Sequence, residues 1–81
     1  MAPPLAPARI VDARGTACPV PILELARAMR TLAAGEGVVL LATDPTVEPD
    51  VHAFCGATGH VLLSLEVADG EYRAHLRKSA G

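Results

Sequence analysis

Two prolines separated by a single residue, Pro19 and Pro21, fix where a helix can begin in this chain. Proline has no amide N–H to donate, and it is tolerated in the first turn of a helix, where the N–H groups have no intrahelical partner. We therefore expect Pro19 to be the first helical residue, with Pro21 still in the opening turn. Cys18 is then the N-cap residue of that helix.

The thiol of Cys18 is the main candidate for chemistry. A side chain at a helix N-terminus feels the positive end of the helix dipole, which favours the nucleophilic thiolate. Pro21 has no N–H, so only the amide of Val20 is well placed to bond the sulfur. Pro21 also occupies the place of the second cysteine of a Cys-x-x-Cys redox motif. The alternative is that Cys18 merely caps the helix, although cysteine is a poor cap.

Hydrophobic periodicity predicts the element order β-α-β-α-β-β. The expected strands span 9–12, 38–42, 60–67 and 71–78, and the expected helices run from Pro19 to Gly35 and from an N-cap at Thr46 to Gly59. In the third strand the alternation predicts that one face holds Val61, Leu63, Leu65 and Val67. Asp69-Gly70 is a hairpin signal between the last two strands.

This element order predicts an α/β fold, a two-layer α/β sandwich with a four-stranded mixed sheet and two helices packed on one face. The chain has 81 residues, enough for one small domain. Residues 1–8 are rich in Pro and Ala and are interpreted as a disordered leader, and residues 9–79 as the single domain. The opposite sheet face would be open to solvent, with Arg73, His75 and Arg77 on its last strand.

Composition narrows the function classes. The formal net charge is −2, which gives no general attraction to nucleic acid, so direct RNA binding is not expected despite the basic strip on the last strand. The two cysteines do not make a disulfide scaffold, no segment is long enough to span a membrane, and no secretory signal is present, so a cytoplasmic protein is expected. His52, Cys55 and His60 offer too few ligands for a zinc site, so no metal is expected.

Several motifs together resemble the TusA-type (SirA-like) sulfur-carrier family. The upstream part is Asp12-x-Arg14-Gly15-x-x-Cys18-Pro19-x-Pro21, and the downstream part comprises Gly37, Thr43-Asp44-Pro45, Phe54-Cys55, Gly59-His60 and Tyr72. The Cys-Pro-x-Pro element is specific when the upstream Arg-Gly and the downstream Asp-Pro accompany it. The resemblance covers essentially everything after the leader.

The resemblance implies that Cys18 accepts sulfur from a cysteine desulfurase or a rhodanese-type donor and carries it as a persulfide to an acceptor protein. Destinations known in the family include tRNA thiolation, molybdenum-cofactor metabolism and sulfur oxidation. The persulfide would be a transient carrier form, with no resident cofactor. In this reading the protein is a sulfurtransferase only as one component of a relay. Val20 stands where tRNA-thiolating members commonly have an acidic residue, and Ala17 stands where some members have a basic one.

Other residues have supporting or structural interpretations. Arg14, across the Gly15 turn, could bring positive charge near the sulfur, or it could be a solvated loop arginine. Leu23, with Arg27 one turn further on, could form a docking patch beside Cys18. Cys55 is expected in the core, because free cysteine is among the most buried residue types.

Two other function classes stay open. A non-catalytic protein-interaction or regulatory module could use the same fold and bind a partner through the sheet face or the first helix. An RNA-binding domain is suggested only by analogy of fold, and fold does not imply function. The residues do not identify the donor, the acceptor, the pathway or the oligomeric state.

Overall fold

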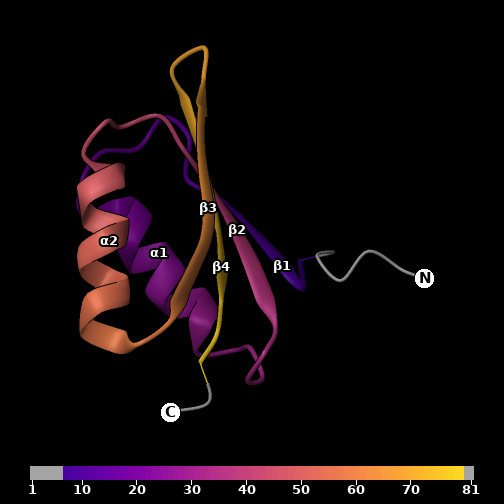
Figure 1. The fold of residues 1–81 in the computed structure, drawn as a ribbon. Helices are drawn as coiled ribbons and strands as arrows, with labels where there is room; N and C mark the ends of the chain where they lie inside the picture. The colour runs from indigo at the N-terminus through magenta and orange to yellow at the C-terminus, as the bar shows by residue number, and fades with distance from the viewer. Residues whose placement is uncertain (1–6, 80–81) are drawn as a thin grey trace.

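The computed structural model describes residues 7–79, which form two layers: a sheet on one side and both helices on the other (Figure 1). The elements are β1 (Arg9–Asp12), α1 (Val20–Met29), β2 (Gly37–Ala42), α2 (Val47–Thr58), β3 (Val61–Ala68) and β4 (Glu71–Arg77). This confirms the predicted two-layer α/β fold and its element order. Of the leader predicted for residues 1–8, residues 1–6 lie outside the described part of the chain.

The sheet has the strand order β1-β2-β4-β3. β1 and β2 are parallel, from Arg9 opposite Val38 to Asp12 opposite Leu41. β4 runs antiparallel to both of its neighbours, so the sheet is mixed. Parallel strands need a crossover connection, and α1 supplies it between β1 and β2. The amide of Ala8 donates a hydrogen bond to the Gly37 carbonyl at 2.8 Å, so the pairing already begins before β1.

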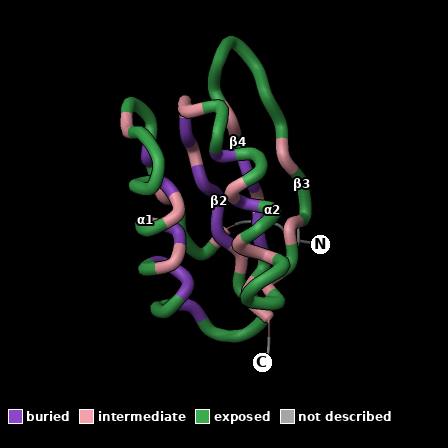
Figure 2. Tube along the Cα trace, turned by 90° about the vertical axis from the view of Figure 1, so that its left-hand side faces the viewer, coloured by how far each residue is buried: buried purple, intermediate pink, exposed green. Residues whose placement is uncertain are grey.

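The hydrophobic core lies between the helices and the sheet. Leu25 of α1, Leu40 of β2 and Leu76 of β4 are fully buried there, together with Val51 of α2. Figure 2 shows the buried segments concentrated in β2, β4 and α1, while β3 and the β3–β4 turn are largely exposed. Because Ala74 and Leu76 face this core, the alternate side chains of β4 point to the open face of the sheet.

The first helix begins later than the sequence predicted. Pro19, and not Cys18, is the N-cap residue of α1, and Val20 is its first helical residue. The Val20 amide donates to the Ala17 carbonyl at 2.9 Å in a turn, and the helical ladder begins where the Leu23 amide donates to the Pro19 carbonyl at 3.0 Å. Cys18 therefore lies in the loop just before the helix, and the cap assignment made for it was wrong.

The first helix also ends earlier than its hydrophobic periodicity predicted. Its last residue is Met29, whereas the pattern predicted a helix up to Gly35. The amides of Thr31 and Leu32 donate to carbonyls three residues back, at 3.0 and 3.3 Å, and no longer to carbonyls four residues back. This tightening ends the α-helix. Leu32 is still buried, which is why the apolar pattern continued past the true helix end.

The alternation predicted for β3 was wrong, because a register shift between Leu62 and Ser64 breaks it. Leu62, just before the shift, is opposite Leu76, and Leu65, after it, is opposite Ala74; both leucines pack against the core. Leu63 falls at the irregularity and is exposed. A β-bulge adds one residue to a strand and so changes which residues face the core.

Candidate functional site

Cys18 is exposed and lies in the loop between β1 and α1. Its backbone amide donates a hydrogen bond to Asp44 Oδ2 at 2.9 Å. Asp44 follows β2, and because β1 and β2 are parallel, the loops that follow them leave the same end of the sheet. The other oxygen of this carboxylate accepts hydrogen bonds from the Thr46 amide at 3.0 Å and the Thr46 hydroxyl at 2.9 Å. Asp44 therefore joins the Cys18 loop to the start of α2.

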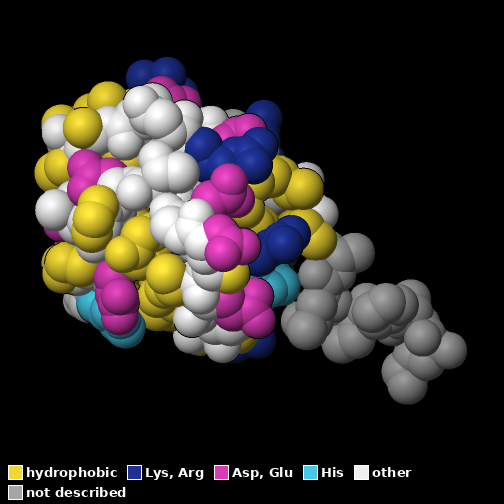
Figure 3. All heavy atoms as spheres, turned by 90° about the horizontal axis from the view of Figure 1, so that it is seen from above, with side chains coloured by type: hydrophobic (Ala, Val, Ile, Leu, Met, Phe, Trp, Pro, Cys, Tyr) yellow, Lys and Arg dark blue, Asp and Glu magenta, His cyan; other side chains and the backbone are white. Residues whose placement is uncertain are grey.

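Cys18 borders a shallow hollow of about 360 Å³ between the two helices. Pro19 and Ile22 line it from the α1 side, and Asp50, Ala53 and Phe54 line it from α2. Asp50 is thus the one charged side chain in a lining that is otherwise apolar, apart from the thiol itself. In the view onto the end of the molecule, hydrophobic and acidic side chains lie next to one another on the helix side (Figure 3, left).

The surroundings of Cys18 raise the pKa of its thiol above the ordinary value. The main cause is a hydrogen bond between the thiol and the Asp50 carboxylate, followed by desolvation and by the negative charges of Asp50 and Asp44. Thr46 opposes the rise only weakly. Its hydroxyl also donates to Asp44 Oδ1 at 2.9 Å. The expectation of a lowered pKa for the Cys18 thiol was therefore wrong.

The backbone around Cys18 explains why the dipole of α1 does not lower the pKa of the thiol. Pro19 separates Cys18 from the first helical residue, and the cap position makes no side-chain hydrogen bond. The Val20 amide, which was expected to bond the sulfur, donates to the Ala17 carbonyl. Pro21 is buried in the first turn and has no N–H. The influence of a helix terminus fades within a turn, whereas the two carboxylates act at close range.

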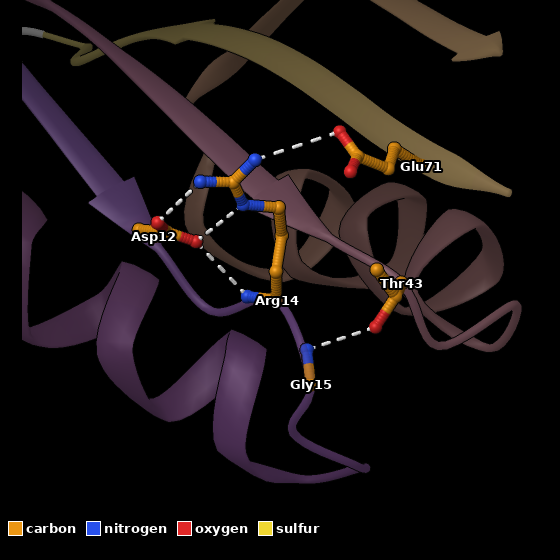
Figure 4. Close-up of polar contacts among 5 residues, drawn as sticks. All are labelled: Asp12, Arg14, Gly15, Thr43 and Glu71. Carbon is orange, nitrogen blue, oxygen red and sulfur yellow. Dashed lines mark hydrogen bonds and ion pairs between the residues drawn. The ribbon is translucent and has the colours of Figure 1, made fainter. Parts of the chain in front are cut away.

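Arg14 does not bring its charge to the sulfur. Its guanidinium binds Asp12 through two hydrogen bonds, Nε to Oδ1 at 2.9 Å and Nη2 to Oδ2 at 2.8 Å, and its Nη1 lies 3.7 Å from Glu71 Oε1 (Figure 4). These bonds lower the pKa of Asp12 to about 2 and raise the pKa of Arg14. The possibility that Arg14 stabilises a Cys18 thiolate is thereby contradicted, since Arg14 is not among the groups that shift the pKa of the thiol.

Gly15 has a local role in holding the loop. Its amide donates to the Thr43 hydroxyl oxygen at 2.9 Å (Figure 4). Its φ of 81° lies in the left-handed region, which glycine adopts without strain. The loop before Cys18 is therefore tied to the segment after β2 at two points, through Thr43 and through Asp44.

The predicted docking residues lie on the exposed side of α1. Leu23 is 56% exposed and Val20, at the helix start, is 38% exposed. Arg27 is exposed as well, with Nη1 3.4 Å from Glu24 Oε2. Neither Leu23 nor Val20 lines the hollow beside Cys18, so these apolar side chains are exposed on α1 outside that depression.

Cys55 is only half-buried, and it packs against the core from α2, as does Phe54. Burial raises the pKa of the Cys55 thiol. His60 lies beside Phe54, with ring centroids 5.8 Å apart, and its Nδ1 accepts a hydrogen bond from the Ser79 amide at 3.1 Å.

Within residues 7–79 no group of three or more His, Cys, Asp or Glu side chains is placed to hold a metal ion. No helix in this part of the chain is long and apolar enough to cross a membrane.

The sequence did not identify Asp50 as a site residue, and it placed Asp44 only in a turn. The pattern Thr43-Asp44-Pro45 marked a turn, but the bond from Asp44 to Cys18 spans 26 residues and depends on the parallel pairing of β1 and β2. Asp50 lies in the first turn of α2, where acidic residues are common because of the helix dipole. Only the packing of α2 beside α1 brings it to the thiol.

Comparisons with known proteins agree with one another. The family model described as Sulfurtransferase TusA matches residues 9–78. The Sulfur carrier protein TusA of Pseudomonas putida (strain W619) is 40% identical over 74 residues, which cover 91% of this chain and 92% of that protein. The Putative sulfur carrier protein YrkF of Bacillus subtilis (strain 168) is 39% identical over 72 residues, 89% of this chain but 38% of its own length.

Among solved structures, the SirA-like protein from Desulfitobacterium hafniense superposes with a TM-score of 0.77 at 22% sequence identity. The match covers 88% of this chain and 97% of that chain. At this level of identity the likeness shows a shared fold.

Proposed function

Because the chain belongs to the TusA family of sulfur carrier proteins, we propose that Cys18 is the residue on which it carries sulfur, as a persulfide. The observation that carries this proposal is the exposure of Cys18 at a point where two tethered loops and two helices meet. A carrier has to present its sulfur to other proteins, and this thiol stands in a shallow, open hollow. Cys55, half-buried against the core, is not presented in this way.

The transfer needs no resident cofactor. The Cys18 thiol gives up its proton, and the thiolate attacks the outer sulfur of a donor persulfide. A bond forms between Cys18 Sγ and that sulfur, the S–S bond of the donor breaks, and the donor cysteine leaves as a thiolate that takes up a proton. Delivery repeats the exchange in the other direction: an acceptor thiolate attacks the outer sulfur, and Cys18 is the leaving group.

The partners in this proposal are a cysteine desulfurase or a rhodanese-type protein as donor, and a sulfur-acceptor protein downstream. Leu23, Val20 and Arg27 are exposed on α1, the helix that follows Cys18, and both partners could dock there in turn. Exposed apolar residues next to a reactive group fit a surface that is covered only transiently. The acceptor would belong to tRNA thiolation, molybdenum-cofactor metabolism or sulfur oxidation, the destinations implied by the family.

The proposal is tested by incubating the protein with a cysteine desulfurase and cysteine, and by measuring its intact mass without reductant. We expect a gain of one sulfur atom that maps to the peptide containing Cys18. Cys18→Ser should abolish the gain, whereas Cys55→Ser should leave it unchanged and serves as the matched control. No gain in the wild type with either a desulfurase or a rhodanese donor would overturn the proposal. So would a gain that persists in Cys18→Ser.

A further inference from the structure

Asp50 is the one charged residue that lines the hollow between α1 and α2 together with Cys18, and the proposed carrier function assigns no role to it. It belongs to the first turn of α2 and lines the same hollow as Cys18. Asp44, whose Oδ2 accepts the Cys18 amide at 2.9 Å, is a second negative charge beside this residue. None of the described cationic side chains is among the groups that shift the titration of the thiol. The sulfur therefore lies in a negative field.

A negative field discriminates between sulfur donors by their charge. A small anion has to bring its charge up to two carboxylates in order to reach the sulfur, and at separations of a few ångströms this repulsion is significant even in water. A donor group that carries a cation next to its own sulfur is attracted instead. Charge complementarity of this kind controls encounter rates and suppresses wrong partners.

We propose that Asp50 is a specificity-determining residue, which makes Cys18 react poorly with small anionic sulfur compounds and well with a donor sulfur that has a cationic side chain beside it. This inference rests on the proposed carrier function and adds the chemistry of the partner: a protein whose sulfur-bearing cysteine lies next to Lys, Arg or protonated His. On docking, that cation pairs with Asp50 and removes the carboxylate from the thiol. The thiol is then free to lose its proton.

Two alkylating reagents measure the discrimination directly. Iodoacetamide is neutral and iodoacetate is anionic, and both react through the same carbon: Cys18 Sγ forms a bond to that carbon, the C–I bond breaks, and iodide leaves. The ratio of the iodoacetate rate to the iodoacetamide rate cancels the fraction of thiolate present. Peptide mapping by mass spectrometry separates modification of Cys18 from that of Cys55.

In Asp50→Asn we expect the ratio at Cys18 to rise about two- to fivefold at low ionic strength, as removal of a unit charge a few ångströms away predicts. The rise should shrink in 1 M salt, where charges are screened within about 3 Å. Asp50→Glu, which keeps the charge, should retain the wild-type ratio. In the same series, the exchange of Cys18 with the dicationic disulfide cystamine, relative to iodoacetamide, should slow in Asp50→Asn.

Glu48→Gln is the matched control. Glu48 lies in the same first turn of α2 and is exposed, but two residues away it points to another side of the helix and does not line the hollow. The variant loses the same charge from the same helix terminus, so its ratio should stay within about 1.3-fold of the wild type if the effect belongs to the position of Asp50. This bound follows from screening of a more distant charge by water.

An unchanged ratio in Asp50→Asn, or an equal change in Glu48→Gln, would overturn the inference. If Asp50→Asn fails to fold, the wild type alone still decides: its ratio must rise with salt concentration, and a ratio that is flat from low salt to 1 M contradicts a negative field at Cys18. Iodoacetate and iodoacetamide report on the charge around the Cys18 sulfur whether or not the protein acts as a sulfur carrier. Failure here is therefore distinguishable from failure of the desulfurase experiment.

Discussion

Asp44 Oδ2 accepts the backbone amide of Cys18 at 2.9 Å, so a carboxylate that follows β2 fixes the position of a thiol that follows β1. The same carboxylate accepts two hydrogen bonds from Thr46 at the start of α2. These bonds from the Thr46 amide, the Cys18 amide and the Thr46 hydroxyl lower the pKa of Asp44. The carboxylate is therefore ionised at neutral pH, the form in which both of its oxygens accept hydrogen bonds.

The first prediction concerns the bonds that Asp44 makes. Asp44→Ala removes every acceptor for the Cys18 amide and for Thr46, and we expect it to lower the urea midpoint of unfolding. Asp44→Asn keeps one acceptor oxygen and should fall between Asp44→Ala and the wild type. Urea unfolding followed by circular dichroism checks the order of the three. An Asp44→Ala midpoint equal to that of the wild type would show that these bonds contribute nothing.

The second prediction concerns Arg14. Because its guanidinium is held by Asp12 and approaches Glu71, we expect Arg14→Ala to leave the iodoacetamide rate of Cys18 within about twofold of the wild type, as expected of charges screened by water. The measurement is a rate of alkylation at fixed pH, with site mapping by mass spectrometry. A rate many-fold slower in Arg14→Ala would restore a role for Arg14 in stabilising the thiolate.

The third prediction is a pH dependence of stability that arises from Asp12. Its pKa is about 2 in the folded protein and 3.8 in an unperturbed side chain, so the unfolded state binds the proton first as the pH falls. The contribution of Asp12 is present above about pH 4 and is lost between about pH 4 and pH 2. Asp12→Asn should therefore flatten the decline of unfolding free energy over that window. A decline identical in the two proteins would argue against the ion pair with Arg14.

The fourth prediction concerns the reactivity of the two cysteines. The pKa of each thiol is raised, so at pH 7 each holds less thiolate than an unperturbed cysteine, whose pKa is about 8.5. Cys18 is exposed and Cys55 is half-buried, so Cys18 should be alkylated first in the folded protein. The rate at Cys18 should rise with pH through an inflection above the ordinary pKa of a cysteine thiol. An inflection near pH 7 would mean that the helix terminus outweighs the carboxylates after all.

The fifth prediction tests the bulge in β3 with neighbouring leucines. Leu65 packs against the core opposite Ala74 but is only partly buried, so its replacement by Ala should cost about 1–3 kcal/mol of unfolding free energy. Leu63 is exposed, and Leu63→Ala should change the unfolding free energy by at most about 0.5 kcal/mol. Denaturant unfolding of both variants checks this difference. Equal costs at the two positions would favour the unbroken alternation that the sequence suggested.

Local signals predicted the elements well, because each depends on residues close in the sequence. The alternation in β4 and the apolar run of β2 led to the correct strands, and Thr46 is the N-cap residue of α2 as expected. The failures share a cause. The end of α1 depends on a change in hydrogen-bond pattern after Met29, and the facing of β3 depends on one extra residue at Leu63. Hydrophobic periodicity cannot detect either of them.

The site was predictable in position but not in electrostatics. The prolines around Val20 located Cys18 correctly at the entrance to a helix. The charge at the thiol, however, is set by Asp44 and Asp50, which lie 26 and 32 residues further along the chain. Arg14, only four residues away in sequence, is paired elsewhere. Proximity along the chain favoured the wrong charge, and only the fold shows which charges reach the sulfur.

The attachment of Asp44 to both the Cys18 amide and Thr46 has a mechanical consequence. Because the Cys18 loop and the beginning of α2 are both bound to Asp44, a displacement of the start of α2 should move the Cys18 sulfur with it. The Cys18 thiol and the Asp50 carboxylate on α2 would then meet a partner protein in a fixed relative orientation. Little further ordering of these two groups would be needed on binding.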